Sequence, residues 1–520
     1  MNLLVALPLL PVAVALWLAF SARAAQLEAG WVVAVVALFP VSVAVMVSPD
    51  QVSLPGVLVL GTASLVLDAA TRAALLLFGG LWLAAGLLLT RTREDGTSAI
   101  ALLLGLMGAS LLAISDGGPL VYAGMLATGY GLVAIMAAEP GKDWLRAGRT
   151  LVVLLVLSDL LVFEVLLSLS AAPGVAPGFG LLLMLLAALA LRGTVPPFHV
   201  WLPVAMATVS TPTAVLLAAV PTGAALMGGL RLLPNGAPEV ALLCLLLGLA
   251  GAGWAVFVGL LQSDSRSTLA YAVGASAALL LVAFPAGPGA DGHLPWLGLA
   301  LLASCSVLPL VALLHAGWSR DLAIAFMLLI HGLAGGHTAV HAGTALPPLA
   351  ALLAPLAAVG AALLLTVAAR RTPAVTVDDG SVEPTRLAFT PVTLAAVGLG
   401  FAWATSAPGF ASLWTTPVGI TLGLLAYRWL PTRSRPAVAP GDLLVPVERF
   451  VSWALRVTRV LTLRYLPRLR DRIESELLGL WDGQAWSRRL HQLDIRLRAW
   501  PATSIMMLVV ALGAAWLMLR

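Results

Sequence analysis

A few ionisable side chains lie inside long apolar runs of this sequence, where a charge is costly. Asp159 and Glu164 share one run, and Arg192 lies in the next. The other candidates are histidines of a later stretch, namely His331, His337 and His341, preceded by His315. Such groups in a lipid environment form ion pathways, proton relays or buried charge pairs. We therefore predict that they carry ions or stabilise the fold by pairing.

Arg192 begins an unusual stretch, "RGTVPPFHVWLP". Adjacent prolines remove backbone donors and end a helix, and the unpaired groups are tolerated in a membrane only where protein or water surrounds them. Discontinuous helices near the midplane recur in ion transporters. A proline kink that only improves packing is the alternative interpretation. The predicted broken-helix motif comprises Pro196, Pro197, His199 and Pro203, and we expect His199 to be a hydrogen-bonded structural residue.

Spacing decides which of these groups are expected to meet. Asp159 and Arg192 fall in neighbouring predicted helices and have opposite charges, so they could form a buried pair, and the sequence leaves open whether they do. Glu164 follows Asp159 by five residues and faces a different side of the same helix. His337 and His341 have the i, i+4 spacing of metal ligands, but no carboxylate or cysteine is close to them in the sequence. We predict no metal and no cofactor, because no CxxC pair, phosphate loop, nucleophile elbow or HExxH motif occurs.

The composition requires an all-α polytopic membrane protein to position these residues. The chain has 520 residues, of which 60% are hydrophobic and 10% are charged, whereas soluble domains carry about 25% charged residues. The net charge of +5 is explained by membrane topology, and we predict no nucleic-acid partner.

Apolar runs of about 20 residues can cross the bilayer as helices. The sixteen predicted spans are 3–20, 31–47, 71–90, 97–115, 119–138, 148–171, 178–193, 205–230, 239–261, 267–285, 294–315, 322–340, 347–369, 387–406, 412–430 and 502–519. We expect a discontinuity at 178–193 and leave a second one open at 322–340.

Positive charges orient these helices. Basic residues concentrate in alternate loops, which by the positive-inside rule are the inner ones. Arg72 and Arg231 are exceptions in the predicted outer loops. This pattern predicts a bacterial-type inner membrane with both termini on the outer side. The first helix is expected to be retained, although Ala22-Arg23-Ala24 resembles a signal-peptide cleavage site, because no basic residue precedes the apolar run.

The chain divides into three predicted parts. Residues 1–430 form the transmembrane bundle, 431–500 a basic amphipathic segment, and 501–520 a last helix. The amphipathic segment is too charged to span and is expected on the inner surface. Anionic lipid is one expected partner for it, and neighbouring subunits, held as by a lateral strut, are the other.

Two motifs resemble the antiporter-like membrane subunits of respiratory complex I, membrane hydrogenases and Mrp cation/proton antiporters. One is "PFHVWLPVAMATVSTPTAV", and the other is "SDSRSTLAYA", which contains Asp264 and Arg266. Asp159 in "LSDLLVF" falls where the distal subunit of complex I, the most similar member, has an aspartate. The resemblance implies the fold and ion translocation, and it adds Arg266 to the candidate residues.

The same resemblance exposes departures from the family. A glutamate expected in the fifth helix falls at Gly124 or Met125, a lysine of the seventh at Arg192, a histidine of the eighth at Ala218 and a lysine of the eleventh near Ser304. A buried lysine can release a proton, whereas arginine, with a pKa above about 12, effectively does not. Arg192 is therefore expected to hold a charge and to be a poor carrier.

Three functions remain open. The chain is a proton- or sodium-translocating subunit, a membrane scaffold that has lost pumping and anchors partners, or a partner subunit for uptake of an anion such as bicarbonate. The expected partners are other membrane subunits and a peripheral redox or catalytic subunit. Electron transfer has to come from those chains, so the protein itself would be a non-redox subunit of an NADH:quinone oxidoreductase-like or hydrogenase-like complex.

Overall fold

The computed structural model describes residues 3–20, 29–49, 51–54, 63–89, 96–139, 144–171, 177–233, 235–288, 293–314, 318–373, 414–429 and 456. Met1–Leu444 form one unit and Val445–Arg520 a second, of which only Arg456 is described. The predicted spans 387–406 and 502–519 lie outside the described residues, as does the amphipathic segment apart from Arg456.

Within the described residues, helices form along the long apolar runs. Their bounds are α1 Leu3–Phe20, α2 Ala29–Met46, α3 Ala69–Leu89, α4 Gly96–Ile114, α5 Gly118–Ala137, α6 Trp144–Ala171, α7 Phe179–Arg192, α8 Trp201–Thr208, α9 Thr211–Leu217, α10 Val220–Leu232, α11 Ala241–Leu260, α12 Ser265–Ala283, α13 His293–Val311, α14 Trp318–Gly343, α15 Pro348–Ala351, α16 Ala354–Arg371 and α18 Thr415–Trp429. Among the described residues, 12 spans are long and apolar enough to cross a membrane. The all-α polytopic membrane architecture is thereby confirmed.

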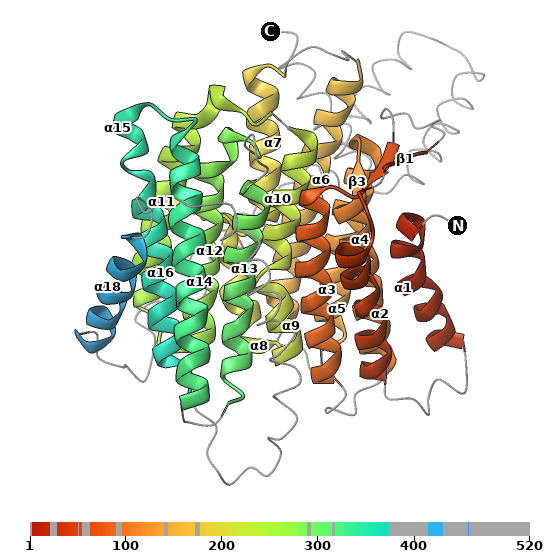
Figure 1. Cartoon of the computed structure of the whole chain (residues 1–520), viewed down its shortest axis with the longest axis horizontal. Helices are drawn as coiled ribbons and strands as arrows, with labels where there is room; N and C mark the ends of the chain where they lie inside the picture. Colours follow the sequence, from red (N-terminus) through yellow and green to blue (C-terminus); the bar gives the residue numbers. More distant parts are fainter. Residues whose placement is uncertain are drawn as a thin grey trace, which may run out of the picture. The chain divides into compact units, whose positions relative to one another are not determined.

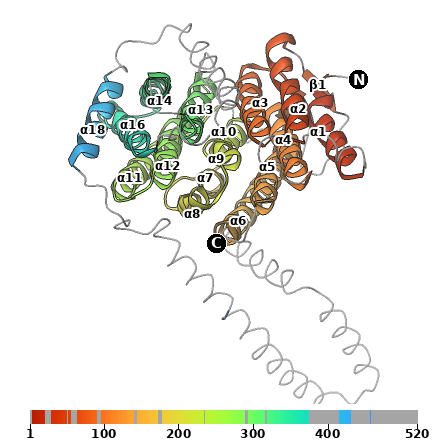
Figure 2. The same cartoon turned by 90° about the horizontal axis from the view of Figure 1, so that it is seen from below.

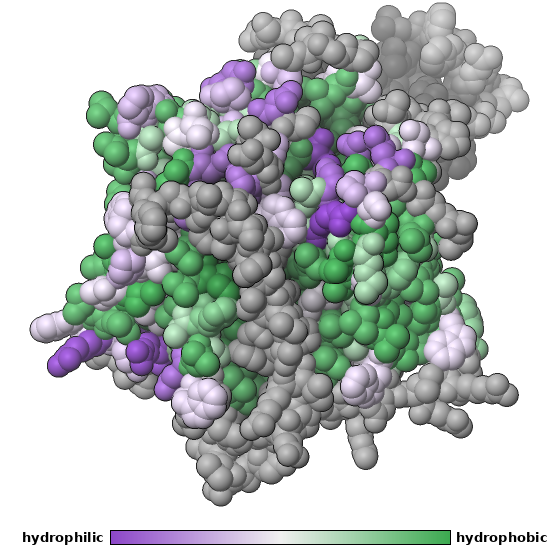
Figure 3. Space-filling view, in the orientation of Figure 1, coloured by the Kyte–Doolittle hydropathy of each residue, from purple (hydrophilic) through white to green (hydrophobic). Residues whose placement is uncertain are grey.

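The helices run side by side as a bundle (Figure 1). Seen along its helices, the bundle has α9, α10, α12 and α13 inside, α1 and α18 at opposite ends, and α6 at one edge (Figure 2). Burial agrees, since the span Thr211–Leu232 is 100% buried and α1 only 22%. Figure 3 shows broad apolar areas between more hydrophilic upper and lower ends. This distribution suits a protein whose middle faces hydrocarbon.

Small residues allow neighbouring helices to approach closely. A Cβ on Gly108 of α4 would lie 2.5 Å from the backbone of Ala127 of α5, and one on Gly124 of α5 would lie 2.6 Å from the Cα of Leu112 of α4. Such contacts strengthen van der Waals packing between membrane helices, where the hydrophobic effect does not drive association. They fix α5 beside α4 and thereby position the residues of α5 that face the site.

Two expectations about helix continuity were wrong. The discontinuity left open at 322–340 does not occur, because α14 runs unbroken over Trp318–Gly343 and contains no proline. The predicted helix 205–230 is instead divided. Its first residues belong to α8, the backbone leaves the helix at Val209 and Ser210, and α9 starts at Thr211 with Pro212 in its first turn.

A small sheet was not expected from the sequence. Strands β1 (Gln51–Leu54), β2 (Ala63–Val66) and β3 (Ser115–Asp116) are antiparallel in the order β1-β2-β3. Gln51 pairs with Val66, and Ser64 pairs with Asp116. The sheet lies at the end of the bundle where α3 and α5 begin, and it ties the two helices together.

Candidate functional site

The discontinuity after α7 is present. The helix ends at Arg192, and Thr194 adopts a positive φ of 55°. Pro196 and Pro197 have no N–H with which to continue the helix. The chain resumes as a short 3-10 turn at Phe198–Val200 and then as α8. The half-helix α7 therefore points its carboxyl end, with Arg192 in the last turn, into the bundle. A cation at this end complements the helix dipole.

A second discontinuity lies next to the first. The helix that starts at Thr211 stops at Leu217 and resumes at Val220. Pro221 explains the stop, because proline cannot donate to the carbonyl of Leu217 four residues earlier. Thr222 joins the two discontinuities, since its hydroxyl donates to the carbonyl of Gly193 at 3.0 Å and contacts the Thr194 hydroxyl at 2.6 Å. Side chains thus satisfy the backbone that the prolines leave open.

Arg192 is the charged centre of the site. Its side chain is 2% exposed, and its Nη2 donates to Oδ1 of Asp159 of α6 as part of a buried ion pair. Its Nη1 donates to the backbone carbonyl of Met125 of α5 at 2.6 Å. The Tyr130 hydroxyl, also from α5, donates to Oδ2 of Asp159 at 3.0 Å. Three helices thus converge on one charge pair.

The space for the guanidinium comes from Gly129. A Cβ at this position would lie 2.7 Å from Nη1 of Arg192. Within the described residues, Nε of Arg192 has no hydrogen-bond partner. The pair is neutral overall, which is the form in which two charges are tolerated inside a protein. The pair places two fixed, opposite charges at the discontinuity, and its arginine cannot release a proton.

A cavity lies beside this discontinuity. Its volume is about 40 Å³, and its wall includes Leu189, Gly193, Thr222 and Phe284. A polar space of roughly 10–15 Å³ suffices for one water molecule, provided that it finds hydrogen-bond partners. The wall is mainly apolar, and the hydroxyl of Thr222 is engaged with Gly193 and Thr194.

His331 of α14 contacts Ser304 of α13. Its Nδ1 lies 2.8 Å from the Ser304 hydroxyl, which donates to the Leu301 carbonyl at 2.6 Å. Because this hydroxyl proton is already engaged, Ser304 accepts a hydrogen bond from Nδ1–H, and Nε2 is then the nitrogen without a proton. His331 is 1% exposed. An imidazole from α14 therefore lies next to Ser304, near which the resemblance places a family lysine.

The other predicted residues are dispersed. His199 is buried and packs edge-on against Tyr271 at a ring-centroid distance of 5.1 Å. The expected hydrogen bond is not found, because neither ring nitrogen of His199 has a partner among the described residues. His341 contacts the Gly287 carbonyl through Nε2 at 2.9 Å, and His337 is buried on the same helix. Arg266 donates to the Val209 carbonyl at 2.6 Å, at the turn between α8 and α9. The structure thus brings Asp159 and Arg192 together but not the remaining candidates, and Glu164 lies away from the pair.

Sequence reasoning missed several residues of the site. Tyr130 and Thr222 were overlooked because uncharged residues are common in membrane helices. Glu139, just after α5, was overlooked because it lies in a polar loop. Its carboxylate accepts from the Ser210 hydroxyl at 2.6 Å, from the Ser210 N–H at 3.1 Å and from the Thr213 hydroxyl. It therefore caps α9, and the Ser-Thr-Pro-Thr sequence was the feature that could have predicted a helix start there.

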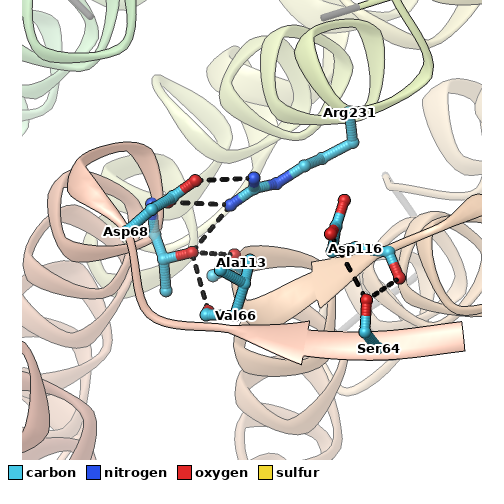
Figure 4. A network of polar contacts seen from close by, with 7 residues as sticks. Ser64, Val66, Asp68, Ala113, Asp116 and Arg231 are labelled. Carbon is cyan, nitrogen blue, oxygen red and sulfur yellow. Dashed lines mark hydrogen bonds and ion pairs between the residues drawn. The ribbon is translucent and has the colours of Figure 1, made fainter. Parts of the chain in front are cut away.

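The two exceptional arginines at the predicted outer end have structural partners. Arg231 makes a bidentate pair with Asp68 at 2.8 and 3.0 Å and donates to Thr71 at 2.7 Å (Figure 4). Arg72 donates to the Ala44 carbonyl at 2.8 Å, near the end of α2. Burial acts to raise the pKa of Asp68, but hydrogen bonds and charge from Arg231 outweigh it and hold this pKa below its ordinary value. Structural pairing thus accounts for both exceptions to the charge rule.

The segment that contains the ion pair is similar in sequence to a known family. Residues 149–332 match the family described as NADH:quinone oxidoreductase/Mrp antiporter, transmembrane. This segment contains Asp159, Arg192, Arg266 and His331. None of the curated proteins is significantly similar in sequence.

Three solved structures share the fold. A chain of the Mrp complex from Dietzia sp. is 18% identical with a TM-score of 0.66, over 100% of this chain and 63% of that one. A chain of the membrane-bound sulfane sulfur reductase, an archaeal respiratory membrane complex, is 14% identical with a TM-score of 0.62, over 96% and 99% of the two chains. A chain of respiratory complex I from Thermus thermophilus is 19% identical with a TM-score of 0.52, over 82% and 97%. The present chain thus spans 63% of the length of its Mrp counterpart.

Proposed function

We propose that the chain is an antiporter-like membrane subunit of a multisubunit complex that translocates protons or sodium ions. The family match of residues 149–332 and the similarity of the fold to the three solved chains support this proposal. The three similar chains all come from membrane complexes that their names describe as an Mrp complex, a sulfane sulfur reductase or respiratory complex I. The expected partners are the other membrane subunits of such a complex and a peripheral redox or catalytic subunit.

The observation that carries this proposal is the buried pair at the discontinuity. Asp159 and Arg192 face each other where α7 stops, and adjacent discontinuities of α7 and α9 are joined through Thr222. Ordinary packing does not require an ionised pair inside a membrane bundle, and such groups are typical of ion pathways. A fixed charge at this point sets the field that an ion experiences as it passes.

The titrating steps belong to other residues. Arg192 holds its proton, so a proton pathway has to use carboxylates and imidazoles. We assign this part to His331, whose Nε2 is left without a proton by the Ser304 contact, together with His337 and His341 on the same helix. Glu164 remains a candidate titrating group by its charge alone, whereas Arg266, like Arg192, is a candidate only for a fixed charge.

A scaffold without autonomous pumping is the second candidate, and one observation favours it. Met125 contributes only its backbone carbonyl to Arg192, and Ala218 and Ser304 occupy other positions where the family has ionisable residues. The bundle would then retain its fold, anchor partner subunits and conduct no ions by itself.

The membrane assignment extends the same proposal. A bacterial-type inner membrane with both termini outside follows from the distribution of basic residues. The basic segment 431–500 would then lie along the inner surface and contact anionic lipid or neighbouring subunits.

Reconstituted vesicles test the choice between the two functions. The complex is purified through a tag on this chain, and ion flux is driven by an imposed pH or sodium gradient and followed with an ion-sensitive dye. Translocation predicts flux that His331→Ala abolishes while the complex stays intact. Flux equal to that of empty vesicles, with a complete complex, would support the scaffold instead.

A further inference from the structure

One side of α6 faces away from the bundle. The helix packs against α5, α7 and α8, and it lies at the edge of the bundle in Figure 2. Val153, Val156, Leu157 and Phe163 are 38–47% exposed. Their spacing of three, four, six and seven residues places them on one broad stripe. Glu164 follows Leu157 by seven residues and belongs to this stripe, and its side chain is partly exposed.

Glu164 lies within the membrane-spanning part of this stripe. The helix has 28 residues and is therefore roughly 42 Å long at 1.5 Å per residue, which exceeds the hydrocarbon thickness of about 30 Å. Glu164 follows Arg149, which marks the predicted inner end of the span, by 15 positions, or roughly 22 Å, and this depth is less than the hydrocarbon thickness. A glutamate is too short to reach the interface from there as lysine and arginine do.

No residue of the described chain neutralises this carboxylate. The carboxylate of Asp159, five positions earlier, accepts hydrogen bonds from Arg192 and Tyr130. Glu164 has no hydrogen bond or ion pair with any described residue. Intramembrane carboxylates pair or face water, so the partner of Glu164 has to come from outside this part of the chain.

The stripe adjoins the charge pair through Tyr130. The Tyr130 side chain is 39% exposed, and its hydroxyl donates a hydrogen bond from α5 to Asp159 of α6. A protein that covers the stripe would therefore also cover Tyr130. We call the surface formed by Tyr130, Val153, Val156, Leu157, Phe163 and Glu164 the α5–α6 face.

We propose that the α5–α6 face binds a membrane helix of another subunit, which places a lysine, arginine or histidine against Glu164. Charge complementarity selects this occupant. The chain's own predicted last span, 502–519, contains no basic residue. A second copy related by an axis along the membrane normal would bring Glu164 to the level of another Glu164. Arg149 of that copy would lie 15 positions away along α6, roughly 22 Å toward the other end.

Cross-linking tests the proposal in the complex purified through this chain. A photoreactive benzoylphenylalanine replaces Leu157, and the linked peptides are identified by mass spectrometry. We expect cross-links to a membrane-spanning segment of a different subunit that carries a basic residue. Cross-links only to lipid, to 502–519 or to a second copy would overturn the proposal.

A charge variant supplies the second measurement. Glu164→Gln should reduce the amount of that subunit recovered per chain at least tenfold, while Leu246→Gln on the exposed side of α11 should not. Exchanging the charges, with Glu164→Lys here and glutamate in place of the partner's basic residue, should restore recovery. Unchanged recovery with Glu164→Gln, from a chain that elutes as a single folded peak, would contradict the proposal.

The inference rests on membership in a complex, and the two can fail separately. If no membrane subunit accompanies the unaltered chain, the proposed function and this inference both fail. If subunits accompany it but neither cross-link to Leu157 nor respond to Glu164→Gln, only the α5–α6 face is refuted.

Discussion

Arg192 and Asp159, 33 residues apart in the sequence, form a buried ion pair between α7 and α6. The arginine is the last residue of the half-helix α7, and the aspartate lies in the middle of the continuous helix α6. The pair therefore fixes the end of the discontinuous element against the rest of the bundle. Arginine suits this role because its charge persists and its planar group binds Asp159 and the Met125 carbonyl together.

Gly129→Ala should disrupt this arrangement without altering any charge. The new Cβ would lie 2.7 Å from Nη1 of Arg192, so the guanidinium has to leave the Met125 carbonyl. We expect a loss of about 2–3 kcal/mol, typical of overpacking in a well-packed core, measured as a lower Tm in detergent. Gly253→Ala is the matched control, because nothing lies within 4 Å of its Cβ. Equal behaviour of the two variants would mean that Arg192 does not occupy this space.

Asp68→Asn tests the pair at the predicted outer end. A carboxylate whose pKa is lowered in the folded state stabilises the fold above its unfolded pKa, about 3.9, and loses this effect as the pH falls through the folded pKa. The variant should be less stable than the parent at pH 7 by about 1 kcal/mol, since Asp68 is partly exposed. Thermal unfolding at several pH values measures this. The difference should shrink below pH 4, and Glu239→Gln at an exposed carboxylate should show no such pattern. A difference that grows at low pH would contradict the assignment.

Glu139→Ala should destabilise the start of α9. The variant loses three acceptor contacts to Ser210 and Thr213, and hydrogen bonds to a charged group contribute about 1.5–3 kcal/mol each. We expect the free energy of unfolding to fall by about 2 kcal/mol or more, and Glu139→Gln to recover part of it. Tryptophan fluorescence during thermal unfolding measures this. Equal stability of the alanine and glutamine variants would show that the carboxylate does not cap this helix.

The orientation is testable with cysteines at exposed, described positions. Asn235→Cys should react with a membrane-impermeant maleimide added to intact cells, while Arg149→Cys should react only after the cells are opened. The native Cys244 and Cys305 are buried, so background labelling should be low. The reverse pattern would invert the predicted topology.

The apolar runs made most helices predictable, because a span of α3 or α12 consists of little else. Hydropathy does not detect a break inside such a run, however. Ser210 with Pro212, and Pro221, divide the predicted helix 205–230 while leaving its mean hydropathy high. The prolines after Arg192 were detected because two adjacent prolines beside a charge cannot belong to a regular span.

The candidate site was predictable where charge revealed it. Asp159 and Arg192 were paired from the sequence because two opposite charges in adjacent helices are rare. Tyr130, Thr222 and the Met125 carbonyl have no such property, since a hydroxyl or a carbonyl becomes part of the site only through the packing of helices. For the same reason the sequence did not place His331 beside Ser304, because helix spacing does not determine which faces of α13 and α14 meet.

A double-mutant cycle on Arg192 and Asp159 tests the central claim most directly, namely that a permanent charge pair holds the discontinuous helix. The amount of folded, assembled protein is measured by size-exclusion chromatography for Arg192→Ala, Asp159→Ala and the double variant. Each single variant strands a buried charge at a cost of about 3–5 kcal/mol, so both should assemble poorly and the double variant should assemble better than either. Single variants that assemble like the parent, with no gain in the double variant, would contradict the claim.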